Sequence, residues 1–274
     1  MRDHDSPDRS HNGWIAIAAA TLTAAGVLTL ICGAVFVWSG VYNVAATSKH
    51  SRPIEWLLHF VMQRSVALHA PALTPPDLHD PALIRRGAAH FASGCAPCHG
   101  APGELASPIA QQMTPVPPGL YSADRDFTPS QLFWIVQHGV KMTAMPGWSA
   151  QSRADEIWAM VAFLEELPHL NTPDYLKLSG AAGAATFLPQ DKPFASVFDP
   201  STCARCHGAD GRGELGVFPS LAGRDAARIE KALHDYRDGS RPSGFMQPVA
   251  ATLSDDAIAD AARYYAALAA VGSP

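Results

Sequence analysis

The longest run of apolar positions extends from Trp14 to Trp38, inside a wider stretch, 10–48, without Asp, Glu, Lys or Arg. No polar face recurs at helical spacing in this run, as one would in a helix on the surface of a soluble domain. At about 1.5 Å per residue, a helix of this length can cross about 30 Å of hydrocarbon. Trp14, Trp38 and Tyr42 stand where interfacial aromatic side chains are found. The pattern predicts a transmembrane anchor over residues 14–42.

A cleaved signal peptide is the alternative reading of this segment, because the small residues Val44, Ala45 and Ala46 would suit a peptidase. The apolar run is longer than the roughly 7–15 residues of a signal h-region, which favours an uncleaved anchor. Basic residues stand on both sides of the run, so the positive-inside rule assigns no orientation.

Apolar residues return at helical spacing between Ile54 and Ala70. They predict an amphipathic helix that lies near the membrane surface or packs on the globular part. A proline-rich stretch follows, so residues 43–79 are interpreted as a juxtamembrane helix and linker.

Two helical segments follow, residues 80–170 and 185–272. In each, we expect a middle helix and a closing amphipathic helix after a pair of cysteines. Thr128 and Ser254 precede two of these helices as N-caps. We find no convincing strand, so the predicted fold class is all-α, with long loops rich in Pro and Gly.

Composition adds little beyond this. The chain is 47% hydrophobic and 16% charged, and the apolar run accounts for part of that imbalance. The net charge of −5 argues for no particular partner. There is no basic stripe and no nucleic-acid motif, so nucleic acid is not an expected partner.

The cysteines carry the most specific signal. Four of the five stand in two Cys-x-x-Cys-His pentapeptides, which is the attachment signature of c-type haem. Both thiols of a motif bond to the porphyrin, and the adjacent histidine lies under the iron as proximal ligand. The residues concerned are Cys95, Cys98, His99, Cys203, Cys206 and His207.

Three other interpretations compete. A zinc site would place its cysteine pairs about 15–20 residues apart, and here they are about a hundred apart. A thioredoxin-like redox pair would need a βαβ pattern. Disulfides would explain the cysteines but not the histidines. Cys32 lies within the apolar span and is interpreted as a small apolar residue.

Methionines in loops are the candidate distal ligands. In the first segment Met145, in Met-Pro-Gly-Trp, is favoured, with Met142 as the alternative and Met113 as a remote third. In the second segment Met246 stands in the matching position. Methionine as second ligand raises the potential of a haem.

Both segments resemble class I c-type cytochromes, fused in tandem behind a membrane anchor. In that family the first and last helices cross near the haem, where a small residue meets an aromatic one. Gly87 and Phe91, with Trp158 and Phe163, match this layout in the first domain. The last-helix aromatic of the second domain is matched by Tyr264 and Tyr265, whereas its first helix is poorly marked around 186–198.

The same family has a proline whose carbonyl accepts a hydrogen bond from the proximal histidine. The resemblance assigns this role to Pro219 in the second domain and to Pro118 in the first. Such a contact fixes the imidazole and tunes its basicity.

The resemblance extends to membrane-bound dihaem cytochromes of bacterial respiratory chains and to cytochrome subunits of periplasmic dehydrogenases. It implies two covalently bound haem c groups, attached outside the cytoplasmic membrane. It therefore implies a single-pass protein with a cytoplasmic tail, residues 1–13, and both haem domains in the periplasm.

The function expected from this resemblance is electron transfer rather than catalysis. The donor would be a quinol-oxidising complex or a dehydrogenase, and the acceptor a terminal oxidase. One alternative is a dihaem peroxidase, which would recruit a histidine from among His90, His138, His169 and His234. The other is the electron-exit subunit of a larger membrane oxidoreductase.

Overall fold

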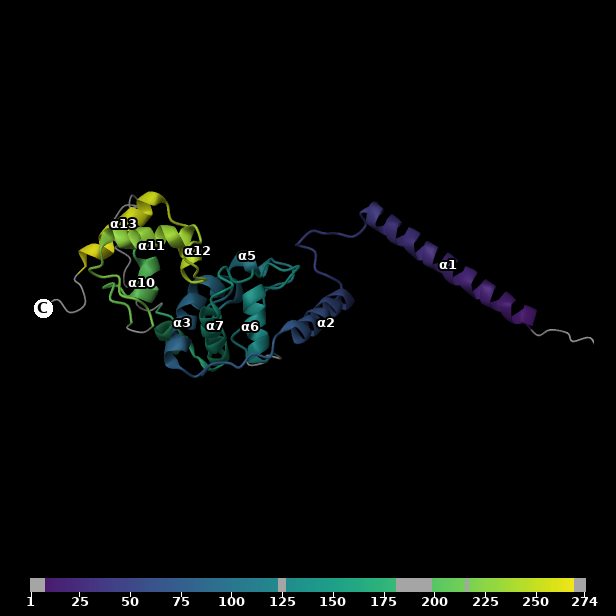
Figure 1. Ribbon diagram of the computed structural model, residues 1–274, viewed down its shortest axis with the longest axis horizontal. Coiled ribbons are helices and arrows are strands. Elements are labelled where there is room, and N and C mark those ends of the chain that lie inside the picture. The colour runs from purple at the N-terminus through teal and green to yellow at the C-terminus, as the bar shows by residue number, and fades with distance from the viewer. Residues whose placement is uncertain (1–7, 123–126, 181–198, 215–216, 269–274) are drawn as a thin grey trace, which may run out of the picture. The chain divides into compact units, whose positions relative to one another are not determined.

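The computed structural model describes residues 8–122, 127–180, 199–214 and 217–268. Within these ranges every regular element is a helix, and the one extended pairing is an isolated bridge between Ala101 and Glu104. This confirms the all-α fold class (Figure 1). The poorly marked start of the second domain, residues 186–198, and the first part of the tail, residues 1–7, lie outside the described ranges.

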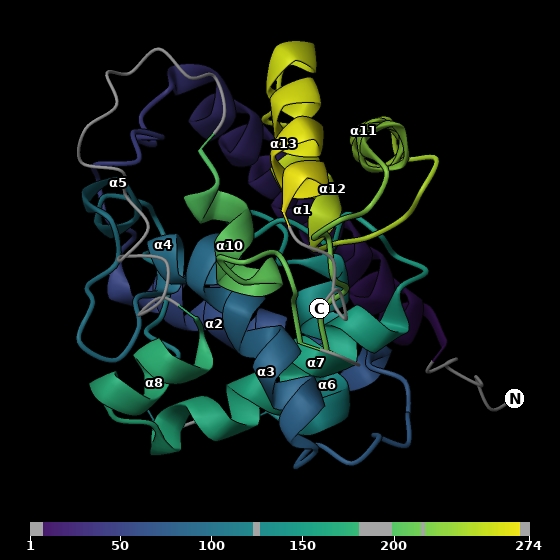
Figure 2. The ribbon, with the colours of Figure 1, turned by 90° about the vertical axis from the view of Figure 1, so that its left-hand side faces the viewer.

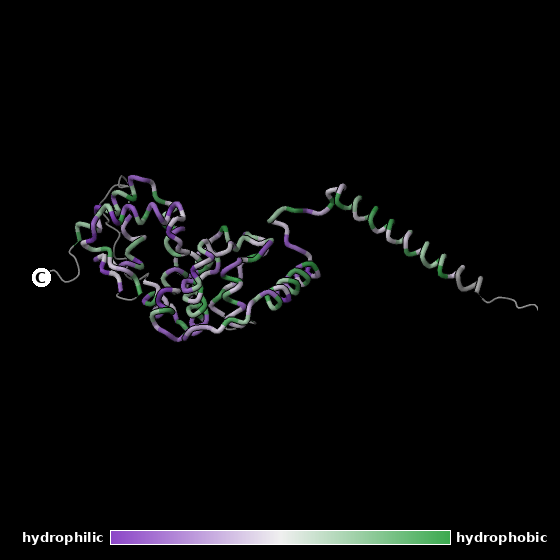
Figure 3. Tube along the Cα trace, viewed as in Figure 1, coloured by the Kyte–Doolittle hydropathy of each residue, from purple (hydrophilic) through white to green (hydrophobic). Residues whose placement is uncertain are grey.

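Helix α1, Asp8–Ser39, contains the long apolar run. Its segment from Gly13 to Ser39 is long and apolar enough to cross a membrane, and Figure 3 shows apolar residues along its whole length. The hydroxyls of Thr21, Thr23 and Thr29 donate to carbonyl oxygens one turn earlier in the helix. These polar groups are thereby satisfied within the helix, as a hydrocarbon environment requires. Residues up to Ser48 form a unit separate from the rest of the chain.

Helix α2, Arg52–His69, confirms the helix expected over 54–70. Val66 is its one buried residue, on the side that meets helix α6, Pro129–His138. Much of the apolar face remains exposed, including Leu57, Leu58 and Val61. Helix α2 therefore packs against the globular part through only a small part of its surface.

The first domain is built on the crossing of helix α3, Pro81–His90, with helix α7, Ala154–Glu166. A Cβ atom at Gly87 would lie 2.1 Å from the Ala159 carbonyl oxygen, so the backbones approach too closely for any other residue. The rings of Phe91 and Phe163 lie 5.1 Å apart beside this crossing. A small residue thus meets an aromatic one, as the resemblance implies.

Trp158 does not take part in this aromatic pair, and its assignment there was wrong. Its ring packs on Phe133 at 4.7 Å, on the side of α7 that covers α6. Residues 158 and 163 lie on different faces of a helix with 3.6 residues per turn, so they cannot share one contact.

Helix α6 begins at a capping box, in which Thr128 and Gln131 each bond to the other's backbone. The predicted N-cap at Thr128 is therefore confirmed. Helix α8, Thr172–Leu178, was not expected from the sequence. Asn171 caps it, and Tyr175 adds a buried ring to the core beside Phe91 and Phe163.

The second domain comprises helices α10, Ser201–His207, α11, Ala226–Arg237, α12, Met246–Ala250, and α13, Asp255–Ala267. Helix α11 packs against α13, and Ser254 caps α13 as predicted. Its smaller core gathers Ile229, Ala261, Ala262 and Tyr265. Figure 2 shows α10 lying beside α3 of the first domain, in agreement with their contacts.

Candidate haem-binding sites

The first Cys-x-x-Cys-His motif lies just beyond the helix crossing. Helix α3 continues through a π-helical turn, Phe91–Cys95, into the short helix α4, Ala96–His99. Gly100, at a φ of 71°, ends that helix in a conformation that favours glycine. The turn and the short helix together present Cys95, Cys98 and His99 from one compact segment.

The His99 ring is oriented by the backbone of a distant loop. Its Nδ1 lies 2.8 Å from the carbonyl oxygen of Pro118. A carbonyl can only accept, so Nδ1 carries the proton and Nε2 keeps its lone pair. This is the tautomer that an Nε2 metal ligand needs, and it confirms the contact assigned to Pro118.

The second motif repeats the arrangement on helix α10. His207 is buried, and its Nδ1 lies 2.9 Å from the carbonyl oxygen of Pro219. Gly208, at a φ of 76°, ends the helix as Gly100 does. The contact assigned to Pro219 is thus confirmed, and the two motifs share one geometry although no strong repeat links their sequences.

Burial shifts the pKa of the two motif histidines. It lowers the pKa of both His99 and His207, and the hydrogen bond to a proline carbonyl offsets part of that decrease. Both imidazoles are therefore neutral at pH 7, in the form that binds a metal.

The pKa of three motif thiols is shifted in the opposite direction. Burial raises the pKa of Cys95 to about 12, with the neighbouring Cys98 adding to the increase. Burial also raises the pKa of Cys203 and Cys206 to about 11. A redox-active pair needs a lowered thiol pKa because the thiolate is the nucleophile. The environment of these cysteines therefore disfavours the thioredoxin-like interpretation.

The zinc-site and disulfide interpretations also differ from the observed arrangement of the cysteines. All five cysteines fall in the described ranges, and each is a free thiol. In the same ranges, no three side chains of His, Cys, Asp or Glu gather as metal ligands. Each motif offers two thiols and one imidazole, a set that suits the covalent attachment of a porphyrin and the ligation of its iron.

The loop after α6 carries the candidate distal ligand of the first domain. The Met145 backbone is held on both sides, since its amide donates to Thr143 Oγ1 at 3.1 Å and its carbonyl accepts from Val140 at 3.2 Å. Met145 is half-buried, whereas Met142 is 84% exposed at a φ of 63°. The structure thus holds Met145 in place and leaves Met142 pointing into solvent. Met113, the remote third candidate, lies just past the short helix α5, Pro108–Gln111.

The candidate distal ligand of the second domain, Met246, is the first residue of helix α12 and is half-buried. Its amide donates to Ser243 Oγ at 3.1 Å. The preceding residue, Phe245, belongs to the second domain. Its side chain nevertheless packs against the hydrophobic core of the first domain. The loop before Met246 is therefore part of the contact between the domains.

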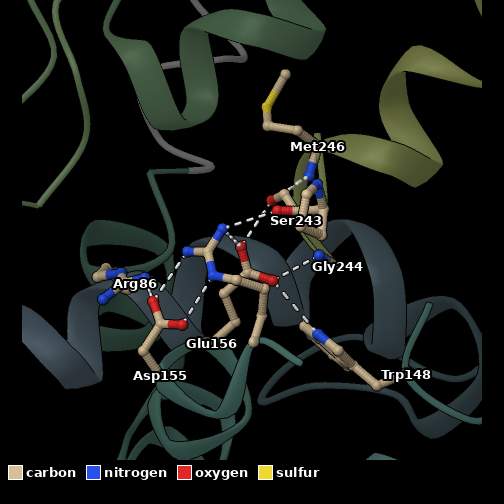
Figure 4. Close-up of polar contacts among 9 residues, drawn as sticks. Arg86, Trp148, Asp155, Glu156, Ser243, Gly244 and Met246 are labelled. Carbon is tan, nitrogen blue, oxygen red and sulfur yellow. Dashed lines mark hydrogen bonds and ion pairs between the residues drawn. The ribbon is translucent and has the colours of Figure 1, made fainter. Parts of the chain in front are cut away.

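A buried carboxylate at this contact is not predicted by the sequence. Glu156, in the first turn of α7, is 1% exposed and contacts residues of both domains (Figure 4). In the sequence it is one of two acidic residues at a helix N-terminus, where negative charge is ordinary. Nothing in the local pattern distinguishes it from the exposed Asp155 beside it.

The comparisons with known proteins support the c-type cytochrome assignment. Residues 82–164 and 190–264 match the family described as cytochrome c oxidase, cbb3-type, subunit III, and together these segments exceed half of the chain. The cytochrome c-554(548) of Halomonas halodenitrificans is 46% identical over 67 residues, 23% of this chain and 81% of that protein.

Two other relatives align over more than half of this chain. The thiosulfate dehydrogenase electron acceptor of Thiomonas intermedia is 27% identical over 179 residues, 64% of this chain and 79% of that protein. The cbb3-type cytochrome c oxidase subunit FixP of Azorhizobium caulinodans is 31% identical over 167 residues, 57% of this chain and 52% of that protein. The chain thus spans about half the length of the oxidase subunit.

Two all-α domains, two Cys-x-x-Cys-His segments on helices and two matching family segments agree with one another. The chain belongs to the family described as cytochrome c oxidase, cbb3-type, subunit III: it is a tandem class I c-type cytochrome, an electron-transfer protein of the kind that binds haem c covalently.

Proposed function

We propose that this chain is a membrane-tethered dihaem electron carrier of the periplasm. One haem is attached to Cys95 and Cys98, and the other to Cys203 and Cys206. The iron ligands are His99 with Met145 in the first domain and His207 with Met246 in the second. Each bound iron supplies one-electron chemistry between the ferrous and ferric states.

The observation that carries this proposal is the pair of hydrogen bonds from His99 to Pro118 and from His207 to Pro219. Each bond directs the Nε2 lone pair away from the loop and fixes the ring plane, as metal-ligating histidines require. Two separate domains would not both orient a motif histidine in this way for packing alone.

The surroundings of the other histidines favour a carrier over a peroxidase. The His90 ring stacks on Phe245 at 4.8 Å and meets Trp148 at 5.0 Å. His234 Nδ1 accepts from Arg237 at 3.0 Å. His138 and His169 are exposed. Methionine on both irons would leave no open position for a peroxide substrate.

The tether has a physical purpose in this proposal. Helix α1 confines the haem domains to the membrane surface, which raises their effective concentration near membrane enzymes without adding a contact. The exposed apolar face of α2 follows α1 after a short connection. That face would lie in the headgroup region and limit the rotation of the globular part.

The partners follow from the relatives' names. We propose a periplasmic dehydrogenase as donor and a terminal oxidase as acceptor, with a quinol-oxidising complex as the alternative donor. The second candidate role is that of an electron-exit subunit within an oxidase or another membrane oxidoreductase, which the match to an oxidase subunit family favours.

The test begins with the full-length protein extracted from membranes in detergent. Denaturing mass spectrometry should show the mass of two attached haems, and the Cys98→Ala and Cys206→Ala variants should each show fewer thioether bonds at one motif only. The near-infrared spectrum of the ferric protein should show the methionine-to-iron charge-transfer band for both haems. A high-spin or bis-histidine signal from either haem would contradict the proposed ligands.

The two candidate roles differ in the mass of the native assembly. A carrier should migrate as a separate particle after mild extraction and should be oxidised by an added oxidase. A stable subunit should instead co-purify with oxidase polypeptides in fixed proportion.

A further inference from the structure

The buried carboxylate of Glu156 lies at the contact between the two domains. At 1% exposure it is among the least accessible side chains of the described residues. Charged side chains are rarely buried to this extent unless they are paired and fully hydrogen-bonded. The hydrogen-bond partners of this carboxylate therefore indicate its structural role.

Those partners come from the loops of both candidate distal methionines (Figure 4). Trp148, in the loop that carries Met145, donates its indole N–H to Oε2 at 3.3 Å. From the loop that carries Met246, Ser243 donates its hydroxyl to Oε1 at 2.6 Å, and the Gly244 amide donates to Oε2. One carboxylate is thus shared by two loops that are distant in sequence.

Only two hydrogen bonds separate this carboxylate from the backbone of Met246. Ser243 Oγ donates to Glu156 and accepts from the Met246 amide at 3.1 Å. A shift of the carboxylate would therefore move the first turn of α12, from which the Met246 side chain projects.

Close packing makes the contact rigid. A Cβ atom at Gly244 would lie 1.9 Å from the Trp148 Nε1, so the backbone of one methionine loop touches the indole of the other. Phe245 inserts between the two domains, with its ring 4.8 Å from that of His90 and 5.7 Å from that of Trp148. The loop before Met246 thus takes its position from the first domain.

Arg153 supplies the compensating charge. Its Nη1 lies 3.1 Å from Glu156 Oε1 and also donates to the Pro242 carbonyl at 3.0 Å. Its remaining donors bond to Asp155, which fixes the guanidinium. Charge-assisted bonds of this kind are stronger than neutral ones, and removal of one partner leaves the others buried without an acceptor.

We propose that Glu156 is a positioning residue that holds both distal methionine loops and makes the ligation of the second haem depend on the first domain. This inference rests on the proposed function, because it takes Met145 and Met246 as the ligands. Outer contacts of this type hold and tune the ligands of metal sites. Glu156 acts on the first loop through the Trp148 side chain, and on the second loop through the Ser243 hydroxyl and the Gly244 amide.

The test uses the full-length haem protein in detergent with a Met145→His change, so that the remaining methionine-to-iron band reports the second haem alone. Glu156→Ala is added to this background and also to the wild-type chain. Glu165→Ala, an exposed residue of the same helix, is the matched control for charge and helix. The readouts are the near-infrared band, the reduction potential of each haem, and the haem content by mass.

We expect Glu156→Ala to abolish most of the second-haem band and to lower that haem's potential, because the methionine ligand is what raises it. Glu156→Gln keeps the shape of the side chain and one oxygen acceptor, and should restore part of the band. Glu165→Ala should leave both readouts at wild-type values. Unchanged band and potential in Glu156→Ala would overturn the proposal.

Ser243→Ala tests the same link from the other domain, if Glu156→Ala loses its haems or its fold. It removes the one side chain that connects the carboxylate to the Met246 amide. It should weaken the second-haem band and leave the first unchanged, and an intact band would overturn the proposal. Failure of the proposed ligands is recognised separately, because the wild-type protein would then lack the methionine bands before any substitution.

Discussion

At the scale of single residues, hydrogen bonds to backbone groups decide which side chains are available as ligands. The Pro118 carbonyl fixes the His99 tautomer, and the loop around Met145 is tied at the amide and the carbonyl of that residue. Met142, only three positions earlier, has no such restraint on its exposed side chain. A ligand has to be held before it binds, because any freedom that it retains must be lost on coordination.

The choice between these two methionines gives the first prediction. Met145→Ala should remove the methionine band of the first haem and lower its potential, within the roughly 0.8 V over which axial ligands set haem potentials. Met142→Ala should change neither quantity, since its side chain is solvated. The near-infrared band and a redox titration measure both, and the reverse pattern would assign the ligand to Met142.

A second prediction concerns His90, which is packed between Phe245 and Trp148. Burial lowers the pKa of His90 from its ordinary value of 6.5 to about 4. As the pH falls through 6.5, His90 becomes protonated in the unfolded chain. In the folded protein the same imidazole stays neutral until about pH 4. Folding stability should therefore be lost over this window, by up to about 3 kcal/mol, and be unaffected by His90 above it.

Denaturant unfolding of the wild-type chain and of His90→Gln, at several pH values between 7 and 4, measures this effect. The difference in unfolding free energy between the two proteins should shrink or reverse as the pH falls. Parallel curves for the two proteins would show that His90 does not contribute to the acid sensitivity.

At the scale of elements, the α3–α7 crossing is the feature that places the first motif. The π-helical turn at the end of α3 delivers Cys95, and its Phe91 packs on Phe163 of α7. Any change that separates the two helices therefore moves the haem attachment segment as well as the core.

Gly87→Ala tests the crossing. The added Cβ would lie 2.1 Å from the Ala159 carbonyl oxygen, so the helices must move apart. We expect a loss of about 1–3 kcal/mol from overpacking, seen as a lower Tm in thermal unfolding. Gly26→Ala is a control with the same change in a helix, because nothing lies within 4 Å of that position. An unchanged Tm in Gly87→Ala would mean that the crossing relaxes without loss.

At the scale of the whole molecule, the two c-type cytochrome domains contact each other through specific side chains. Arg85 of α3 bonds to Glu214 of the second domain at 3.3 Å, and its guanidinium lies 5.5 Å from the centre of the Phe218 ring. The Glu156 cluster forms the other part of this contact. In the proposed dihaem carrier, two methionine loops fixed against each other would give the haems a defined relation, which would suit electron transfer between them.

The membrane tether is also a property of the whole molecule. If α1 is an uncleaved anchor, the intact mass of the mature protein should include the segment 14–42 in addition to the haems. Alkaline carbonate should leave the protein in the membrane pellet. Cleavage after Ala46 would remove that segment, release the protein to the soluble fraction and contradict the tether.

The sequence by itself determined the chemistry and the class of fold. Haem attachment requires two thiols and a histidine at fixed spacing, so the sequence predicts it at Cys95, Cys98 and His99 without coordinates. The helices and their caps at Thr128 and Ser254 follow from local periodicity and side-chain bonding, which are properties of neighbouring residues.

The tertiary structure alone decided which residues meet across the domains. Glu156 looks like any acidic residue at a helix N-terminus, and its burial depends on a loop about ninety residues later, which packs against it. Helix α8 gave too short a signal to predict, and it is stabilised by the burial of Tyr175 in the core. Long-range packing of this kind depends on the fold as a whole, and no local pattern of residues encodes it.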